Sequence, residues 1–134
     1  MLTSICMRAA RMTRFWIMVL QGRKLVRLLP PSENHRADPT DPEAFQPTLY
    51  TVDLMDPDFA AHPSMNGMLV YEAVLEPGDV LFIPEGWAHQ ALNLEWVVMI
   101  SSNYVDQHNV DIHLEWHDFD QVCKHCLHTA CCNA

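Results

Sequence analysis

Residues 75–103 have the sequence LEPGDVLFIPEGWAHQALNLEWVVMISSN, and this stretch decides the fold. A Pro77-Gly78 turn pair precedes a short apolar run, residues 79–83, that is rich in strand-forming side chains. Pro84–Gly86 breaks the chain again, and two more runs with strand character follow before the stretch ends at Asn103. The pattern predicts three short strands joined by tight turns.

His89 lies on the second of these strands, where it shares one face with Ala91 and Asn93. An imidazole that follows a rigid turn at the mouth of a small antiparallel barrel is well placed to bind a metal ion. A single histidine in a strand is also commonly a structural residue. Local chemistry therefore leaves both interpretations of His89 open.

Residues 78–94, GDVLFIPEGWAHQALNL, resemble the late strands of the JmjC, cupin-like family of Fe(II)- and 2-oxoglutarate-dependent oxygenases. In that family this segment supplies the last histidine of a His-x-Asp…His iron site, and His89 takes the matching position. Upstream, QGRKLVRLLPP at residues 21–31 resembles the strand whose lysine binds the 2-oxoglutarate carboxylate, which here is Lys24. Asn103 matches a polar position near the co-substrate. The resemblance implies Fe(II) and 2-oxoglutarate as cofactors, and hydroxylation of a C–H bond in a protein or nucleic-acid substrate.

The His-x-Asp pair of the family lies shortly before the lysine strand, and this sequence differs there. Residues 6–14 are CMRAARMTR, without a histidine or an acid. The first histidine of the chain is His35 and the first acid is Glu33, and both follow the lysine strand. A site of two imidazoles and one carboxylate would then lack two of its three protein ligands. We therefore predict that the iron site is incomplete in the sequence as written.

The strand pattern and the resemblance together predict a mainly β fold, an incomplete double-stranded β-helix (a cupin-like jelly roll) with a C-terminal α-helix. We assign residues 15–105 to the partial barrel. Residues 1–14 form a basic segment that is expected to be helical or loosely ordered, and residues 106–134 hold the helix and a cysteine-rich tail. Additional strands are expected at residues 15–20, 24–29, 48–53 and 68–74.

Composition indicates a globular protein with one domain at most. The chain has 134 residues, of which 49% are hydrophobic and 9% aromatic, so it is long enough to bury a modest core. Its formal net charge of −9 disfavours nonspecific binding to nucleic acid. A protein or peptide partner remains compatible with this charge, as does a homodimer.

Basic residues are concentrated near the start of the chain, where six of the eight precede Glu33. An arginine-bearing start without acids is typical of a mitochondrial targeting segment, but a short helix that replaces the missing early strands is the simpler interpretation. The longest apolar run, residues 15–20, is too short to cross a membrane. Nothing resembles a secretory signal, so we expect an intracellular protein, cytoplasmic or nuclear, with mitochondria as the alternative.

The spacing of apolar residues changes in the C-terminal part of the chain. Apolar residues recur at helical spacing near residues 108–128, which predicts an amphipathic helix that packs on its own barrel or joins a dimer. Four of the five cysteines follow in the tail. Soft ligands there could bind zinc, the alternative being a cysteine-rich tail without metal. The candidate zinc ligands are Cys123, Cys126, His128 and Cys131.

Three hypotheses for function follow from these patterns. The chain is a JmjC oxygenase by descent whose iron site is incomplete. Alternatively, it is a non-catalytic binding module or a truncated form that meets a partner through its barrel rim or open edges. The third hypothesis is a small zinc protein centred on the tail. The missing His-x-Asp pair favours the second over the first as a description of activity.

Overall fold

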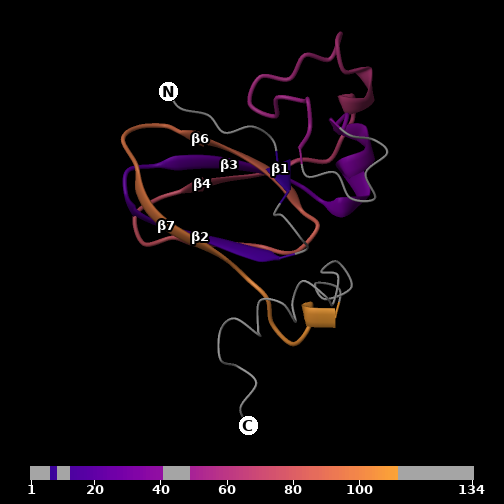
Figure 1. Cartoon of the computed structure of the whole chain (residues 1–134). Coiled ribbons are helices and arrows are strands. Elements are labelled where there is room, and N and C mark those ends of the chain that lie inside the picture. Colours follow the sequence, from indigo (N-terminus) through magenta and orange to yellow (C-terminus); the bar gives the residue numbers. More distant parts are fainter. Residues whose placement is uncertain (1–6, 9–12, 41–48, 112–134) are drawn as a thin grey trace.

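The computed structural model describes residues 7–8, 13–40 and 49–111 of the chain (Figure 1). Strands and short 3-10 helices make up its regular structure. In chain order the elements are β1 (Met7–Arg8), β2 (Arg14–Gln21), β3 (Lys24–Leu29), η2 (Pro31–Arg36), η3 (Pro63–Met65), β4 (Tyr71–Leu75), β5 (Val80–Ile83), β6 (Ala88–Asn93) and β7 (Val98–Tyr104).

The strands form two antiparallel sheets that face each other (Figure 1). One sheet has the order β1-β6-β3-β4, and the other has the order β5-β2-β7. Sequence neighbours such as β2 and β3 therefore belong to different sheets, as a jelly roll requires. The prediction of a mainly β, cupin-like jelly roll is confirmed. Of the helix predicted near residues 108–128, the structure describes residues 108–111, of which 108 and 109 form a turn and 110 and 111 are helical; the rest lies outside the described residues, so the helix stays a prediction.

An inner core fills the space between the two sheets. Because side chains alternate along a strand, each strand sends every second residue inward, so that Val26 of β3 lies opposite Ala91 of β6. On β2 the inward positions are Phe15, Ile17 and Val19. The buried members of this inner core are Ile17, Val19, Val26, Leu75, Ile83 and Ala91.

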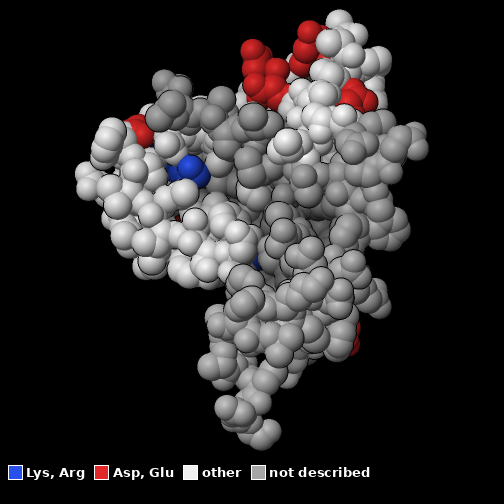
Figure 2. Space-filling model, viewed as in Figure 1, with Lys and Arg blue, Asp and Glu red and all other residues white. Residues whose placement is uncertain are grey.

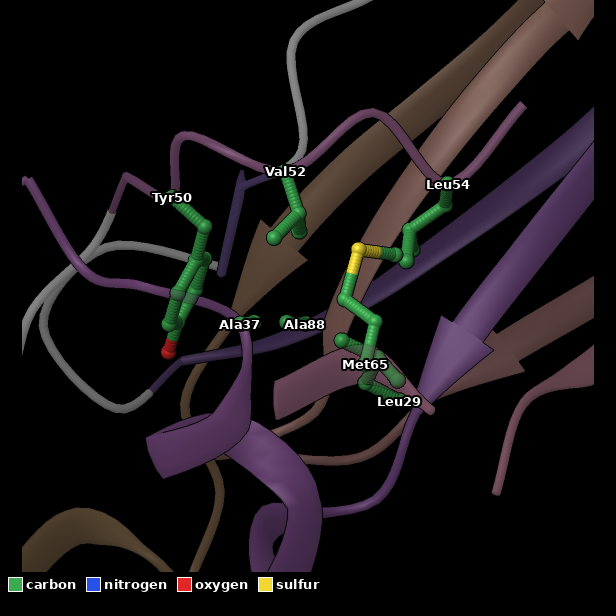
Figure 3. Close-up of a cluster of buried hydrophobic side chains, with 7 residues drawn as sticks. All are labelled: Leu29, Ala37, Tyr50, Val52, Leu54, Met65 and Ala88. Atoms are coloured by element: carbon green, nitrogen blue, oxygen red, sulfur yellow. The ribbon is translucent and has the colours of Figure 1, made fainter. Parts of the chain in front are cut away.

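A second, outer core lies on the other face of the four-stranded sheet. The chain between β3 and β4 packs there and buries apolar side chains against Leu29 of β3 and Ala88 of β6 (Figure 3). Its buried members are Leu29, Ala37, Tyr50, Val52, Leu54, Met65 and Ala88. The four-stranded sheet is therefore covered on both faces, while the outer face of β5-β2-β7 carries exposed apolar residues, among them Leu20, Val80 and Phe82.

The tight connection between β2 and β3 depends on Gly22. Its φ is +78°, a conformation that side chains other than glycine's rarely adopt. A Cβ at this position would lie 2.0 Å from the carbonyl oxygen of Trp96. The connection is also held from β6's side, because the amide of Leu94 donates to the carbonyl of Arg23 at 3.0 Å. Glycine is therefore required where the chain crosses from one sheet to the other, just before Lys24.

Most strand predictions are confirmed, and two local predictions are wrong. The strands expected at residues 15–20, 24–29 and 68–74 appear as β2, β3 and β4. Residues 48–53 do not form a strand over their described part, since only an isolated bridge joins Tyr50 to Pro39. The alternating apolar residues there bury into the outer core instead of pairing with a sheet. Residues 7–8 form strand β1 rather than a helix, because they pair with β6; the rest of residues 1–12 lie outside the described part.

Candidate functional site

His89 points into the barrel from β6 and is only 8% exposed. Its ring stacks on that of Phe15 from β2, with centroids 5.5 Å apart and planes 17° apart. The buried Nδ1 atom makes no hydrogen bond to the described residues. Buried polar atoms rarely lack a hydrogen-bond partner. An atom that lacks one among the described residues therefore points to a ligand, a water molecule or an ion as its partner.

Burial keeps the His89 ring neutral. Removal from water is the main reason why the pKa of His89 is lowered to about 4. A hydrogen bond with the Trp87 backbone opposes this shift, and the charge of Lys24 lowers the pKa further. At physiological pH the imidazole is therefore uncharged and has a lone pair available. That is the state in which histidine binds metal ions.

Lys24 is a buried cation on the adjacent strand β3. It is 8% exposed, and its Nζ donates a hydrogen bond to Asn93 Oδ1 at 2.8 Å. Burial lowers the pKa of Lys24. Within the described part of the chain no carboxylate forms an ion pair with it. A buried ammonium that has one amide oxygen and no counter-ion is a suitable place for an anion.

Strand register places these groups on one inward face. Lys24 lies opposite Asn93, and Leu28 lies opposite His89, with the Val26–Ala91 pair between them. His89 and Asn93 are four residues apart on β6, or about 13 Å of strand. Two polar positions thus border a short apolar row inside the barrel. The sequence prediction did not include Asn93, although its shared face with His89 was a signal that could have identified it.

Asn103 lies at a different place from the Lys24 pair. It is an exposed residue on β7, opposite Phe15 of β2, and its Oδ1 accepts a hydrogen bond from Thr13 Oγ1 at 3.0 Å. Its strand position shares a face with Phe15, on which the His89 ring stacks. The amide that contacts Lys24 is Asn93 instead. The role of Asn103 near a co-substrate stays a prediction.

The residues that the structure describes do not form a complete metal site by themselves. Among them no group of three or more His, Cys, Asp or Glu side chains comes together. The strand partners of His89 are Leu28 on β3 and Met7 on β1, neither of which is a usual iron ligand. One imidazole does not match the two-histidine, one-carboxylate set of non-haem Fe(II). The predicted zinc ligands Cys123, Cys126, His128 and Cys131 lie outside the described residues.

The two loop histidines have different environments. His35 is exposed. His62 is partly buried instead, and its Nδ1 lies 2.5 Å from Asp38 Oδ2. The ring therefore ties η3 to the segment that follows η2, a structural contact away from His89.

Comparison with known proteins agrees with this geometry. A family model described as a cupin-like domain matches residues 14–110, which contain all the described strands except β1. The chain belongs to the JmjC cupin-like family. The matched residues include His89, Lys24 and Asn103.

Several relatives in this family have names that state an activity. The 2-oxoglutarate and iron-dependent oxygenase JMJD4 of Mus musculus is 30% identical over 115 residues, which cover 79% of this chain and 24% of that protein. The lysine-specific demethylase JMJ31 of Arabidopsis thaliana is 33% identical over 103 residues, covering 72% and 18%. The arginine-specific demethylase JMJ20 of the same plant is 38% identical over 50 residues, covering 36% and 11%.

The chain thus spans a quarter or less of the length of these relatives. The names describe those longer proteins. For this chain, the comparisons establish the family. Among the described residues, no helix combines the length and apolar character needed to span a membrane.

Proposed function

We propose that this chain is a JmjC-family domain that has kept the 2-oxoglutarate site at Lys24 and one iron-ligand position at His89, but that the sequence as written lacks a complete iron site. On this proposal the chain alone is a non-catalytic binding module. The observation that carries it is the buried Lys24 ammonium, which has Asn93 as its hydrogen-bond partner and no carboxylate in an ion pair among the described residues.

Lys24 supports binding of a carboxylate. Burying a charge without a counter-ion is unfavourable, and a ligand carboxylate would supply both the charge and the acceptor oxygens. The inner face around Lys24 carries apolar side chains, with Val26 on the same strand and Leu75 opposite Lys24 on β4. A short dicarboxylic acid such as 2-oxoglutarate fits this chemistry, because one of its carboxylates would pair with the Lys24 ammonium.

His89 has the position and the neutral state of a metal ligand, but it is not sufficient to hold an ion by itself. Its imidazole is neutral, and its Nδ1 lacks a hydrogen-bond partner among the described residues. Iron, when bound in this family, would supply oxidation chemistry. A single imidazole competes poorly with water for Fe(II), and no step through iron is assigned to this chain.

The class of partner is also a proposal. Three relatives are named as demethylases of lysine or arginine or as oxygenases, and a side chain of a protein is the substrate that the demethylase names imply for those proteins. A net charge of −9 is compatible with a basic peptide partner and unfavourable for nucleic acid. We therefore propose a protein or peptide as the macromolecule that this domain meets.

Anaerobic calorimetry tests the proposal. 2-Oxoglutarate and Fe(II) are titrated separately and together into the wild type, His89→Ala and Lys24→Met. We expect 2-oxoglutarate to bind without iron, and Lys24→Met to weaken that binding at least about tenfold, since a charged hydrogen bond is lost. Arg23→Met is the matched control, because Arg23 is the adjacent, exposed cation that pairs with Glu95.

Two results would contradict the proposal. Tight Fe(II) binding that requires both His89 and 2-oxoglutarate would mean that other residues complete the iron site, and catalysis would then be expected. Equal 2-oxoglutarate binding by the wild type and Lys24→Met would mean that Lys24 is a structural cation. Circular dichroism of each variant confirms that the fold is retained.

A further inference from the structure

A cavity of about 320 Å³ lies beside the outer core, on the outer face of the four-stranded sheet. We call it the outer cavity. Its most buried lining residues are Leu54 and Met65, whose side chains lie next to each other (Figure 3). Phe59, Met68 and Val70 add further apolar lining. A concave, mostly apolar space of this size is typical of sites that take up a small molecule or one large side chain.

Two strand residues, Arg27 of β3 and Glu72 of β4, form a polar side of the outer cavity. Arg27 Nε donates to Glu72 Oε2 at 2.7 Å, and its Nη1 donates to the carbonyl of Leu54. The pair therefore ties the sheet to the segment that packs on it. Side chains alternate along a strand, so Arg27 lies on the face opposite to that of Val26 and Lys24. The outer cavity is thus separated from the Lys24 site by the sheet itself.

The apolar lining of the outer cavity favours an aromatic occupant. Phe59 lines the cavity and is 54% exposed, so a ring that packs against it would cover it. Met65 and Met68 bring thioethers into the same lining, and methionine sulfur packs favourably against aromatic rings. Methionine is also flexible enough to adjust to the shape of an inserted side chain. These three residues together indicate an aromatic anchor.

The surroundings of the outer cavity are acidic. Residues 49–72 contain four acids and neither lysine nor arginine. Figure 2 shows acidic side chains gathered at the top of the view, over this segment, where Asp56 and Asp58 are exposed. A surface of this sign attracts a cationic partner and repels an acidic one.

Two arginines border the outer cavity without cancelling this charge. Arg27 pairs with Glu72 at 2.7 Å, and Arg36 pairs with Glu33 at 2.9 Å. Arg36 also donates to two backbone carbonyls of the cavity lining. Both guanidinium groups are therefore engaged within the chain, and the three aspartates of residues 53–58 keep the surface negative.

We propose that the outer cavity is a docking site for a basic peptide with an aromatic anchor. One aromatic side chain of the partner fills the cavity, and lysine or arginine residues beside it pair with the aspartates of residues 53–58. The anchor provides apolar burial, and the flanking charges provide attraction and orientation. The proposal requires no ligand at Lys24, because that site lies on the other face of the sheet.

Fluorescence anisotropy on the full chain, at a physiological ionic strength, tests the proposal. The probe is the fluorescein-labelled peptide Gly-Lys-Arg-Phe-Arg-Lys-Gly. We expect saturable binding. Replacing the phenylalanine of the peptide with alanine should weaken binding by about tenfold or more, because the burial of an aromatic side chain is lost. Replacing its four basic residues with glutamate should abolish binding.

Variants of the chain locate the contact. Phe59→Ala should weaken binding of the probe by about tenfold, and Asp56→Lys by about threefold or more. Phe82→Ala removes an exposed phenylalanine from the other sheet, and Asp111→Lys reverses an exposed acid after β7. These matched controls leave binding unchanged. Lys24→Met also leaves it unchanged, so a failure of the 2-oxoglutarate site and a failure of the outer cavity are distinguished.

Three outcomes overturn the proposal. Absence of saturable binding would mean that the outer cavity does not accept this class of peptide. Equal binding of the alanine peptide would mean that charge alone attracts the probe, without an anchor in the cavity. Equal weakening by Phe82→Ala or Asp111→Lys would place the contact elsewhere. Circular dichroism and thermal melting of each variant separate loss of binding from loss of the fold.

Discussion

Strands β6 and β7 are of similar length and have opposite environments. β6 is AHQALN, and four successive residues, 88–91, are buried, including His89 and Gln90. β7 is VMISSNY, begins with three apolar residues, and is exposed on both faces. The strand that carries a histidine and a glutamine is therefore the buried one, and the strand that begins with three apolar residues is exposed. Burial follows from position, because β6 lies between β1 and β3 with a core on each face, while β7 lies at an edge.

The largest expected effect comes from removing a side chain that covers β6. Leu29 lies opposite Ala88 and is fully buried in the outer core. Leu29→Ala should lower the free energy of unfolding by about 3 kcal/mol, through lost burial and the cavity that remains. Urea denaturation measures this change. The matched substitution on β7, Ile100→Ala, should lower the free energy of unfolding by less than about 1 kcal/mol. Equal losses would break the comparison.

The second prediction concerns the pH dependence that burial of β6 creates. The pKa of His89 is about 4 in the folded protein and 6.5 ordinarily. Between these values the unfolded chain binds a proton that the folded chain does not, so stability falls as the pH is lowered from about 6.5 through about 4. The loss at pH 4 is on the order of 3 kcal/mol.

Urea denaturation between pH 7.5 and pH 4 separates this contribution from that of other groups. The free-energy difference between the wild type and His89→Gln should change across the range, because only the wild type loses the contribution of the His89 imidazole. His108→Gln, at an exposed position after β7, serves as the control. If both variants retain the pH profile of the wild type, burial does not lower the pKa of His89 as expected here.

A smaller effect is expected from the hydrogen bonds that join Gln90 of β6 to residues 53 and 54. Gln90 is 2% exposed, accepts a hydrogen bond from the amide of Leu54 at 2.6 Å, and donates to Asp53 at 2.8 Å. Gln90→Ala leaves the Leu54 amide without this acceptor and should cost about 2 kcal/mol. The melting temperature reports the loss. On β7, Ser101→Ala should stay within about 0.5 kcal/mol, and a larger drop there would contradict the contrast.

Local sequence signals predicted the strands well where turns bound them. Pro77-Gly78 and Pro84–Gly86 delimit β5 closely, and Gly22 marks the passage from β2 to β3. Residues 48–53 show where this logic fails. Their alternating apolar residues resemble a strand, but the described residues form isolated bridges such as Pro39–Tyr50, because the outer face of the four-stranded sheet takes Tyr50, Val52 and Leu54 into its core. Alternating apolar residues indicate that one side of a segment is buried. They do not indicate that the segment pairs with a neighbouring strand.

The candidate site was predicted in part. Lys24 and His89 follow from motifs that resemble the JmjC family, and both are buried on the inner face. Asn93 could be placed beside Lys24 only once the β3–β6 register was known, because the two residues are 69 positions apart in the chain. Asn103, predicted near the co-substrate, contacts Thr13 at a solvent-exposed edge.

The sequence by itself determined the family, the strand-and-turn pattern and the identity of two candidate site residues, because turn residues and period-two alternation act locally. Only the tertiary structure decided which strands are covered. It paired Lys24 with Asn93, removed His89 from water, and placed β7 at the end of its sheet among the described strands. The physical reason is that burial, a pKa and a place in a sheet depend on neighbours that the chain brings together from distant positions.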